Sequence, residues 1–545
     1  MKFLVLILLC AVLIVSCSTR EKADLIIRNA TIYTMNEHFD KASVMVVSKG
    51  KVMAIGGDSL LNLFTSDNIM DAKDKFVYPG FIDAHCHFTG YAMDAYKLKL
   101  FGTSSFDEVI QKVVAFAKTN KRIWIEGTGW DQNDWTEKKF PTKDTLDRLF
   151  PDKPVFLLRV DGHAALVNQK ALDICKISNT TKVNGGEIDI KTGILIDNAI
   201  ELVRKYLPEL TKEEAIHDII AAQQEFFKVG LTSVVECGVK KNVVEWLTET
   251  YEANKLQLRS TVMLINDKEN FDSFLNKEPY RNDYFHVAGY KVFTDGSLGS
   301  RGAFMLKEYS DRHGHSGALL LSADSLARIA QQVGNSSYQL CAHAIGDAAN
   351  RTVLQIYGDV LKTKNDRRWR IEHAQVVDTN DIHYFGDFSI VPSVQPTHAT
   401  SDMYWVKDRI GNERTKEAYA YHDLLQQNGW LPLGTDFPVE NLNPIYTFYA
   451  AVFRKDQKDF PEGGFQTENS LSREEALRGM TIWAARSVFE EKEKGSLEAG
   501  KLADFVLLDI DLMKAEAKQV YHAKVLATYI GGKKVYDCFT KPRTD

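Results

Sequence analysis

The stretch V-Y-P-G-F-I-D-A-H-C-H-F, residues 77–88, passes from a Pro-Gly turn into a short apolar run that ends in two histidines. Side chains two positions apart on a strand point to the same face. His85 and His87 therefore share one face at the end of a predicted buried strand, and Cys86 faces the other side, where we interpret it as packing. By itself the pair is either two metal ligands or two unrelated histidines.

Downstream of this strand, apolar β-rich runs alternate with amphipathic helical patterns such as 322–336 and 349–364. We predict further strands at 232–238, 259–265, 289–296, 338–346, 368–375, 388–396 and 431–438. Near-continuous apolar strands that alternate with helices are typical of a parallel sheet, and eight such units predict a (β/α)8 TIM barrel of the α/β class.

Both ends of the chain are rich in short strands and turns, which predicts one composite β-sandwich domain built from residues 24–79 and 487–540. The barrel then occupies residues 80–486. The sequence between its first and second strands is too long for one crossover connection, so we expect an insertion at about 89–225 after barrel strand 1.

Ionisable residues recur where the predicted strands end: Lys291, His343, His373 and Asp436. A lone histidine in an apolar strand is more often a hydrogen-bonded core residue, but catalytic groups of a barrel gather at the carboxyl ends of its strands. Leaving so many polar groups unpaired in one apolar rim would be costly. A divalent metal such as Zn²⁺ would bind all of these groups at once, because imidazole and carboxylate groups are its usual ligands.

A second His-x-His, at His313 and His315, provides a contrast within the same chain. It lies in a polar loop that contains glycine and follows no apolar strand. We expect this pair not to bind metal, so the spacing alone is a weak signal.

Residues 1–17 have a lysine followed by an apolar run that stops at Cys17, which resembles a bacterial lipoprotein signal peptide. That resemblance implies cleavage before Cys17, lipidation of Cys17 and export to the bacterial cell envelope, with a lipid anchor on the periplasmic or outer-membrane face. A plain signal peptide is the alternative.

The net charge of -6 and the lack of a long basic run argue against a nucleic-acid partner.

The pattern resembles the amidohydrolase superfamily and, within it, the YtcJ-like amidohydrolase family 3. The motifs that carry the resemblance span nearly the whole chain after the signal: PGFIDAHCH (79–87), GYKVFTDGSLGSRGA (289–303), CAHAIGD (341–347), RIEHAQ (370–375), LPLGTDFPVE (431–440) and GSLEAGKLADFVLLD (495–509). The resemblance implies a metal-dependent hydrolase with a barrel and a composite β-sandwich.

The resemblance also implies roles for individual residues. One or two divalent ions, Zn²⁺ above all, are expected on His85, His87, Lys291, His343, His373 and Asp436. Lys291 is expected to carry an N6-carboxylate that bridges two metals; unmodified, it favours a mononuclear site. Asp436 is expected to be the catalytic proton shuttle as well as a ligand.

Three residues are candidates for substrate binding: His163, Asp295 and Arg301, the last as a bidentate partner for a carboxylate or phosphate. Trp130 and Trp135 either line a pocket or, as we favour, pack in a core. The expected reaction is hydrolysis of a carbon–nitrogen bond in an amide, formamide-like group or cyclic amide of a small molecule. An esterase or lactonase and a non-catalytic surface lipoprotein are the alternatives, and a homodimer is an alternative to a monomer.

Overall fold

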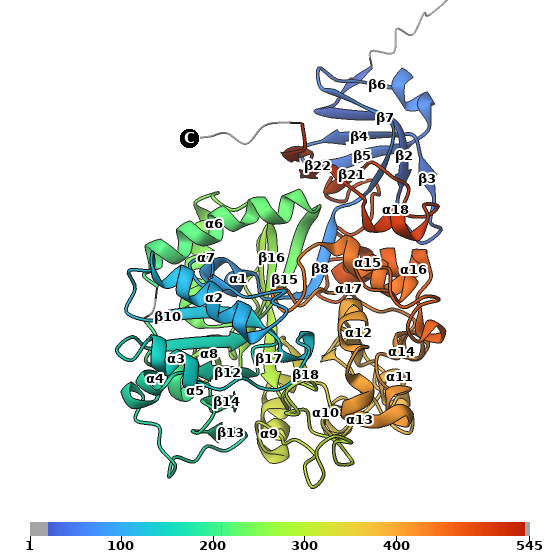
Figure 1. Ribbon diagram of the computed structural model, residues 1–545. Coiled ribbons are helices and arrows are strands. Elements are labelled where there is room, and N and C mark those ends of the chain that lie inside the picture. The colour runs from blue at the N-terminus through green and yellow to red at the C-terminus, as the bar shows by residue number, and fades with distance from the viewer. Residues whose placement is uncertain (1–19, 209, 540–545) are drawn as a thin grey trace, which may run out of the picture.

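The computed structural model describes residues 20–208 and 210–539 and has a parallel sheet at its centre (Figure 1). Seven strands follow one another in the order β20-β19-β18-β17-β16-β15-β8. Their bounds are β8 (Phe81–Cys86), β15 (Leu231–Val239), β16 (Arg259–Ile265), β17 (Phe285–Phe293), β18 (Gln339–Ala344), β19 (Arg370–His373) and β20 (Val391–Ser393). The predicted α/β barrel is confirmed as a nearly closed sheet of parallel strands.

The eighth predicted strand, 431–438, is wrong as a strand, because it forms only a single bridge between Leu433 and Val394. A proline at 432 removes one ladder donor, and Asp436 takes the left-handed φ of 61°. The segment nevertheless closes the barrel through its backbone. Gly434 N donates to Val394 O on one side at 3.0 Å, and Asp436 N donates to His85 O on the other at 2.8 Å.

Helices cover the outside of the barrel: α6 (Lys212–Lys228), α7 (Lys241–Glu252), α8 (Lys268–Phe274), α9 (Ala323–Gly334), α10 (Asp347–Leu361), α11 (His383–Asp387), α14 (Tyr421–Asn428), α15 (Pro444–Phe453), α16 (Arg473–Gly479) and α17 (Ile482–Arg486). α6 begins at a capping box in which Thr211 and Glu214 each accept from the other's backbone N–H. α1 (Phe88–Met93) and α12 (Pro396–Asp402) follow the carboxyl ends of β8 and β20, and α13 (Val406–Thr415) follows α12.

Strands from both ends of the chain share one sheet, drawn in blue and red in Figure 1. Its order is β23-β22-β21-β7-β2-β4-β5, with β3 paired to β2. The bounds are β2 (Leu25–Tyr33), β3 (Lys41–Ala42), β4 (Val44–Ser48), β5 (Lys51–Gly56), β7 (Ile69–Pro79), β21 (Phe505–Leu508), β22 (Val525–Ile530) and β23 (Lys533–Asp537). Only Gly80 separates β7 from β8, so the Pro-Gly turn is where the chain leaves this sheet for the barrel.

Gly80 has no room for a side chain, because a Cβ there would lie 2.3 Å from Thr232 Oγ1.

β1 (Glu21–Lys22) and β6 (Phe64–Thr65) form a separate two-stranded pair. η1 (Asp58–Asn62) and α18 (Ala517–Tyr521) complete the elements at the two ends.

The long segment after α1 forms its own sheet, in the order β13-β14-β12-β11-β10-β9. Its strands are β9 (Leu98–Lys99), β10 (Ile125–Trp130), β11 (Val155–Arg159), β12 (Ala164–Val167), β13 (Gly186–Asp189) and β14 (Ile194–Asp197), with helices α2 (Phe106–Ala117), α3 (Asp144–Leu149), α4 (Gln169–Ile174) and α5 (Glu201–Arg204). Loops of this sheet reach the cavity described below.

Cys17 and the rest of the predicted signal lie outside the described residues, so lipidation and envelope location stay predictions. Among residues 20–208 and 210–539, no helix is long and apolar enough to cross a membrane. The homodimer also stays a prediction, since the structure describes one chain.

Candidate metal centre and active site

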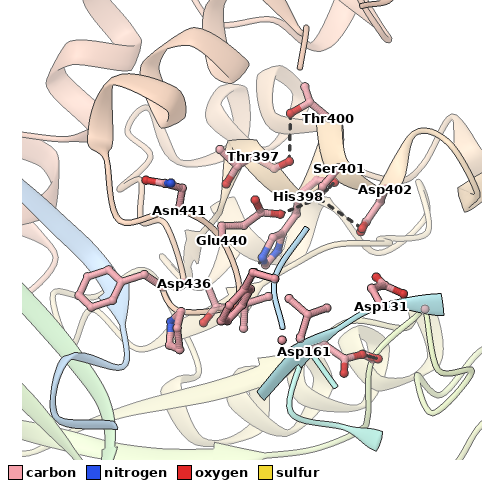
Figure 2. Close-up of a pocket in the computed structure, with 18 of the residues that line it drawn as sticks. Asp131, Asp161, Thr397, His398, Thr400, Ser401, Asp402, Asp436, Glu440 and Asn441 are labelled. Carbon is pink, nitrogen blue, oxygen red and sulfur yellow. Dashed lines mark hydrogen bonds and ion pairs between the residues drawn. The ribbon is translucent and has the colours of Figure 1, made fainter. Parts of the chain in front are cut away.

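A cavity of about 960 Å³ opens at the carboxyl ends of the barrel strands (Figure 2). Its floor is formed by polar residues at the strand ends: His87, Lys291, His343, His373 and Asp436. One wall comes from the insertion, through residues 101–104, 129, 131, 134, 159–161 and 163. The other wall comes from α12 and from the loop that follows Asp436.

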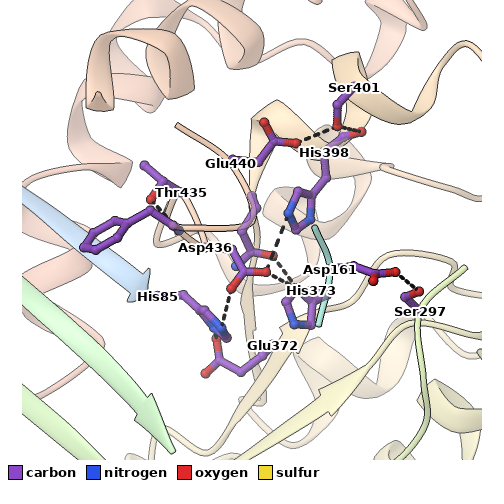
Figure 3. A network of polar contacts seen from close by, with 12 residues as sticks. His85, Asp161, Ser297, Glu372, His373, His398, Ser401, Thr435, Asp436 and Glu440 are labelled. Atoms are coloured by element: carbon purple, nitrogen blue, oxygen red, sulfur yellow. Dashed lines mark hydrogen bonds and ion pairs between the residues drawn. The ribbon is translucent and has the colours of Figure 1, made fainter. Parts of the chain in front are cut away.

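Donor atoms converge on the floor of this cavity (Figure 3). Ligand atoms of His85, His373 and Asp436 all lie within 4.8 Å of one another. Asp436 Oδ1 is 3.2 Å from His87 Nε2 and 3.4 Å from His85 Nε2. The His343 ring centroid lies 4.6 Å from that of His373. The strand ends thus bring together the five histidine and aspartate positions that the sequence singled out.

The donor set fits a divalent cation, because several of its buried atoms have no partner of their own. His343 Nε2 and Asp436 Oδ1 are buried and make no hydrogen bond, although Asp295 Oδ1 lies 3.5 Å from the former and two imidazole nitrogens lie 3.2 and 3.4 Å from the latter. Lys291 is fully buried, and its Nζ lies 3.4 Å from His85 Nε2. Unsatisfied buried imidazole and carboxylate atoms are costly unless a metal binds them.

The protonation states favour metal binding. Burial lowers the pKa of His343 and His373 well below the usual range, so both imidazoles are neutral and have a free lone pair. Burial opposes ionisation of Asp436, but the nearby His85 and His87 hold the pKa of that carboxyl well below its usual value. A neutral imidazole and an ionised carboxylate are the forms that ligate metals.

Glu372 orients His85 from below and was missed by the sequence analysis. Its Oε2 lies 2.5 Å from His85 Nδ1, and its Oε1 accepts from Arg370 Nε at 2.7 Å. Although burial opposes its ionisation, the charge of Arg370 and the hydrogen bond from His85 hold the pKa of Glu372 well below the usual range. A carboxylate on Nδ1 leaves Nε2 of His85 to face Asp436 and the donor cluster.

Two further side chains fix the neighbouring positions. Gln395 Oε1 lies 2.7 Å from His373 Nδ1. The buried Asp83 carboxylate accepts from the backbone N–H of His85 at 3.1 Å and from Thr435 Oγ1 at 2.6 Å. Burial raises the pKa of Asp83 to about 7. Asp83 thereby connects β8 to the segment that carries Asp436.

The three predicted substrate residues have different environments. His163 lines the cavity, with its Nδ1 2.7 Å from Asp197 Oδ1. Asp295 is fully buried behind the floor, where it accepts backbone N–H groups of residues 304, 345 and 346. Arg301 does not line the cavity, because its guanidinium forms a bidentate pair with Asp311 at 2.8 and 3.0 Å. Only His163 therefore keeps a geometry suited to contact with substrate.

The remaining aromatic and histidine candidates lie away from the floor. Trp130 and Trp135 are buried in the core of the insertion, and Trp130 Nε1 donates to a backbone carbonyl. His313 is exposed and pairs with a glutamate, and His315 Nε2 contacts the backbone carbonyl of Arg301. Neither histidine of the second His-x-His lines the cavity.

His398 is a second residue that the sequence analysis missed. It lies in α12 directly after β20, and its Nε2 is 3.6 Å from Asp436 Oδ2. That Nε2 is buried without a hydrogen-bond partner. Its position after a strand end was the available signal, but the predicted strand at 388–396 ended before it.

Known proteins resemble this chain over most of its length. The amidohydrolase family model matches residues 68–536. The chain is 29% identical to the putative amidohydrolase YtcJ of Bacillus subtilis (strain 168), over 93% of this chain and 98% of that protein. It is 25% identical to the N-substituted formamide deformylase of Arthrobacter pascens, over 94% and 98%. A crystal structure of an uncharacterised metal-dependent hydrolase from Pyrococcus horikoshii OT3 superposes with a TM-score of 0.74 at 30% identity, covering 91% and 99%.

Proposed function

The chain belongs to the amidohydrolase family, whose members are metal-dependent hydrolases, and we propose that it hydrolyses a carbon–nitrogen bond in a small amide, formamide-like compound or cyclic amide. One observation carries the proposal. His87, His343, His373, Asp436 and Lys291 line the floor of a single cavity with His85 directly behind Asp436, and buried donor atoms among them make no hydrogen bond.

The residues that would hold one or two divalent ions are His85, His87, Lys291, His343, His373 and Asp436. A bound divalent ion supplies Lewis-acid activation of a water and of a carbonyl oxygen at neutral pH. The fully buried ammonium of Lys291, without an ion pair among the described residues, supports the proposal that its Nζ is carboxylated. An ammonium has no lone pair with which to ligate.

Asp436 is the proposed proton carrier. Its carboxylate lies within 4.0 Å of four imidazoles, those of His85, His87, His373 and His398, and its pKa is held well below the usual range. It accepts a proton from the attacking water and returns that proton to the leaving nitrogen, as general base and then general acid. Because a pure binding site has no use for such a group, this placement favours an enzyme over a binding lipoprotein.

A formamide-like substrate has additional support from the comparison with the N-substituted formamide deformylase, which covers 94% of the chain. That similarity makes a small acyl group the first choice for a substrate panel. Substrate identity is decided by the cavity walls and not by the fold.

The test combines metal analysis with a substrate panel of N-formyl, N-acetyl and cyclic amides, and of matching esters and lactones, with Zn²⁺ and bicarbonate present. We expect one or two divalent ions per chain, loss of amide turnover on chelation, and recovery on adding Zn²⁺. Asp436→Asn should keep the fold, by circular dichroism, and lose turnover by about a hundredfold or more.

Asp359→Asn, at an exposed position of α10, is the matched control and should retain full turnover. Turnover of esters alone would replace the proposed reaction with the esterase alternative. Wild-type amide turnover in Asp436→Asn would exclude the proton-carrier role.

A further inference from the structure

Two carboxylates stand in the cavity wall next to the candidate metal centre, Asp402 at the end of α12 and Glu440 in the loop after Asp436 (Figure 2). Ser401 connects them, since its Oγ donates to Glu440 Oε1 at 2.6 Å and lies 3.5 Å from Asp402 Oδ1. Neither carboxylate touches the donor cluster directly. His398 lies between them and Asp436.

Neither carboxylate is paired with a lysine or arginine in the part of the chain that the structure describes, residues 20–208 and 210–539. Tyr419 Oη and Gln375 Nε2 fix Asp402 from behind, at 2.7 and 3.2 Å from its Oδ2. The other oxygen, Oδ1, is left toward Ser401 and the cavity.

The side chains around the pair are also left unsatisfied. Thr397 is 7% exposed and lines the cavity, and its Oγ1 is buried without a hydrogen-bond partner. His398 Nε2 is buried and makes no hydrogen bond either, with Asp436 Oδ2 3.6 Å away. Unpartnered polar atoms that line a cavity indicate that a ligand completes their hydrogen bonds.

The negative charge around Asp402 and Glu440 favours a positively charged ligand. α12 ends at Asp402, so the partial negative charge of the helix C-terminus adds to the two carboxylates. Burial raises the pKa of Asp402 to about 7, and it raises the pKa of Glu440 as well. A bound cation would remove the cost of ionising both groups.

Apart from Lys291 in the candidate metal centre, the cationic groups of the cavity give an anionic ligand little to bind. Arg159 is buried, and its guanidinium already bonds two carboxylates of the insertion: Asp131 and Asp161. Lys455 already pairs with Asp459 at 2.9 Å, and Lys458 is exposed at the rim.

We propose that the substrate carries a cationic group, an ammonium or a guanidinium, which Asp402 and Glu440 hold while the scissile amide lies against the donor cluster. This substrate class rests on the proposed hydrolysis of a carbon–nitrogen bond at the same site. Charge-assisted hydrogen bonds to two carboxylates would give the cationic end its preference over a neutral end of the same shape.

The experiment compares three formamides of equal length with Zn²⁺-loaded protein: N-formylputrescine, N-pentylformamide and 5-formamidopentanoate. Their far ends are an ammonium, a methyl and a carboxylate. We expect kcat/KM for the ammonium to exceed that for the methyl by about 10- to 100-fold, with the carboxylate poorest. In the double variant Asp402→Asn, Glu440→Gln, the ratio of ammonium to methyl should fall toward one.

Asp408→Asn, an exposed aspartate on the neighbouring α13, is the matched control and should leave the ratio unchanged. Circular dichroism and the Tm check that the double variant folds, and Glu440→Gln alone provides a milder variant. A wild-type ratio near one, or a ratio that persists in the folded double variant, would overturn the proposal.

Binding without turnover separates this proposal from the proposed reaction. Saturation-transfer NMR should detect n-butylammonium on the wild-type protein but not n-butanol or butyrate, and the double variant should lose that signal. If no formamide is hydrolysed but n-butylammonium still binds through the two carboxylates, the reaction is wrong and the cation subsite stands. Equal signals for all three probes would contradict the subsite.

Discussion

At the scale of single residues, the site depends on side chains that hold the ligands as much as on the ligands themselves. His85 has one ring nitrogen 3.4 Å from Asp436 and the other 2.5 Å from Glu372, which Arg370 in turn holds ionised. Arg370 and Glu372 lie on one face of β19, because they are two positions apart. The sequence R-I-E-H thus contains both an orienting carboxylate and a ligand.

Glu372→Gln tests that role. An amide in place of the carboxylate weakens the hold on His85 and leaves the buried Arg370 without its ion pair. We expect metal affinity to fall by about 10- to 100-fold, measured by competition with a fluorescent zinc chelator.

The control is Glu490→Gln, because Glu490 is also buried and lies 3.4 Å from a histidine, His286, away from the cavity. That variant should lower the Tm and leave metal affinity unchanged. Equal loss of metal in both variants would mean that Glu372 acts only through stability.

At the scale of elements, the segment 431–436 closes the barrel between the first and last of its seven strands. It takes the eighth place without an extended ladder, and its backbone reaches β20 on one side and β8 on the other. The left-handed turn at Asp436 directs this carboxylate to the donor cluster. A regular strand would alternate its side chains with period 2 and continue past the rim.

Gly434 is where this close approach is tightest. A Cβ at this position would lie 2.5 Å from His85 N and 2.8 Å from His85 O, both of them backbone atoms. We therefore expect Gly434→Ala to lower stability by about 1–3 kcal/mol or more in urea unfolding, and to lower metal content because His85 shifts.

Gly57→Ala is the matched control, since its Cβ would meet nothing within 4 Å and the residue has no positive φ. It should leave both quantities unchanged. Full stability and full metal content in Gly434→Ala would show that the segment is free to move away from β8.

At the scale of the whole molecule, the barrel and the terminal sheet are joined by a buried ion pair. Arg259, at the start of β16, donates to both oxygens of Asp504, which directly precedes β21. Asp504 also accepts the backbone N–H of Gly531 at 2.7 Å. Both charged side chains are almost fully buried.

Asp504→Asn should therefore destabilise the protein by about 3–5 kcal/mol, because it leaves the Arg259 guanidinium buried without a counter-charge. Urea unfolding followed by circular dichroism measures the change. Asp272→Asn removes an exposed i,i+4 ion pair with Lys268 and should leave the Tm unchanged. An equally small change in unfolding free energy in both variants would mean that the Arg259–Asp504 ion pair does not stabilise the contact between the barrel and the terminal sheet.

The candidate ligands could be predicted from sequence because five of them lie at or near the carboxyl ends of apolar parallel strands, which meet at one rim, and Asp436 ends an apolar segment that takes the eighth place. For the same reason the α/β barrel followed from alternating patterns, and the shared terminal sheet reflects β-rich runs at both ends. The sequence did not predict the environments of Arg301 and Asp295. Arg301 pairs with Asp311 and Asp295 binds the backbone at 345–346, and loop conformation decides both contacts.

By itself, the sequence determined the strand faces, the ligand types and their order along the chain, since period-2 alternation is a local property. Only the tertiary structure decided which groups orient those ligands and what lines the cavity. His398, Asp402 and Glu440 come from a helix and a loop, and Glu372 meets His85 across 287 positions. Such contacts depend on register and loop path, which no local pattern encodes.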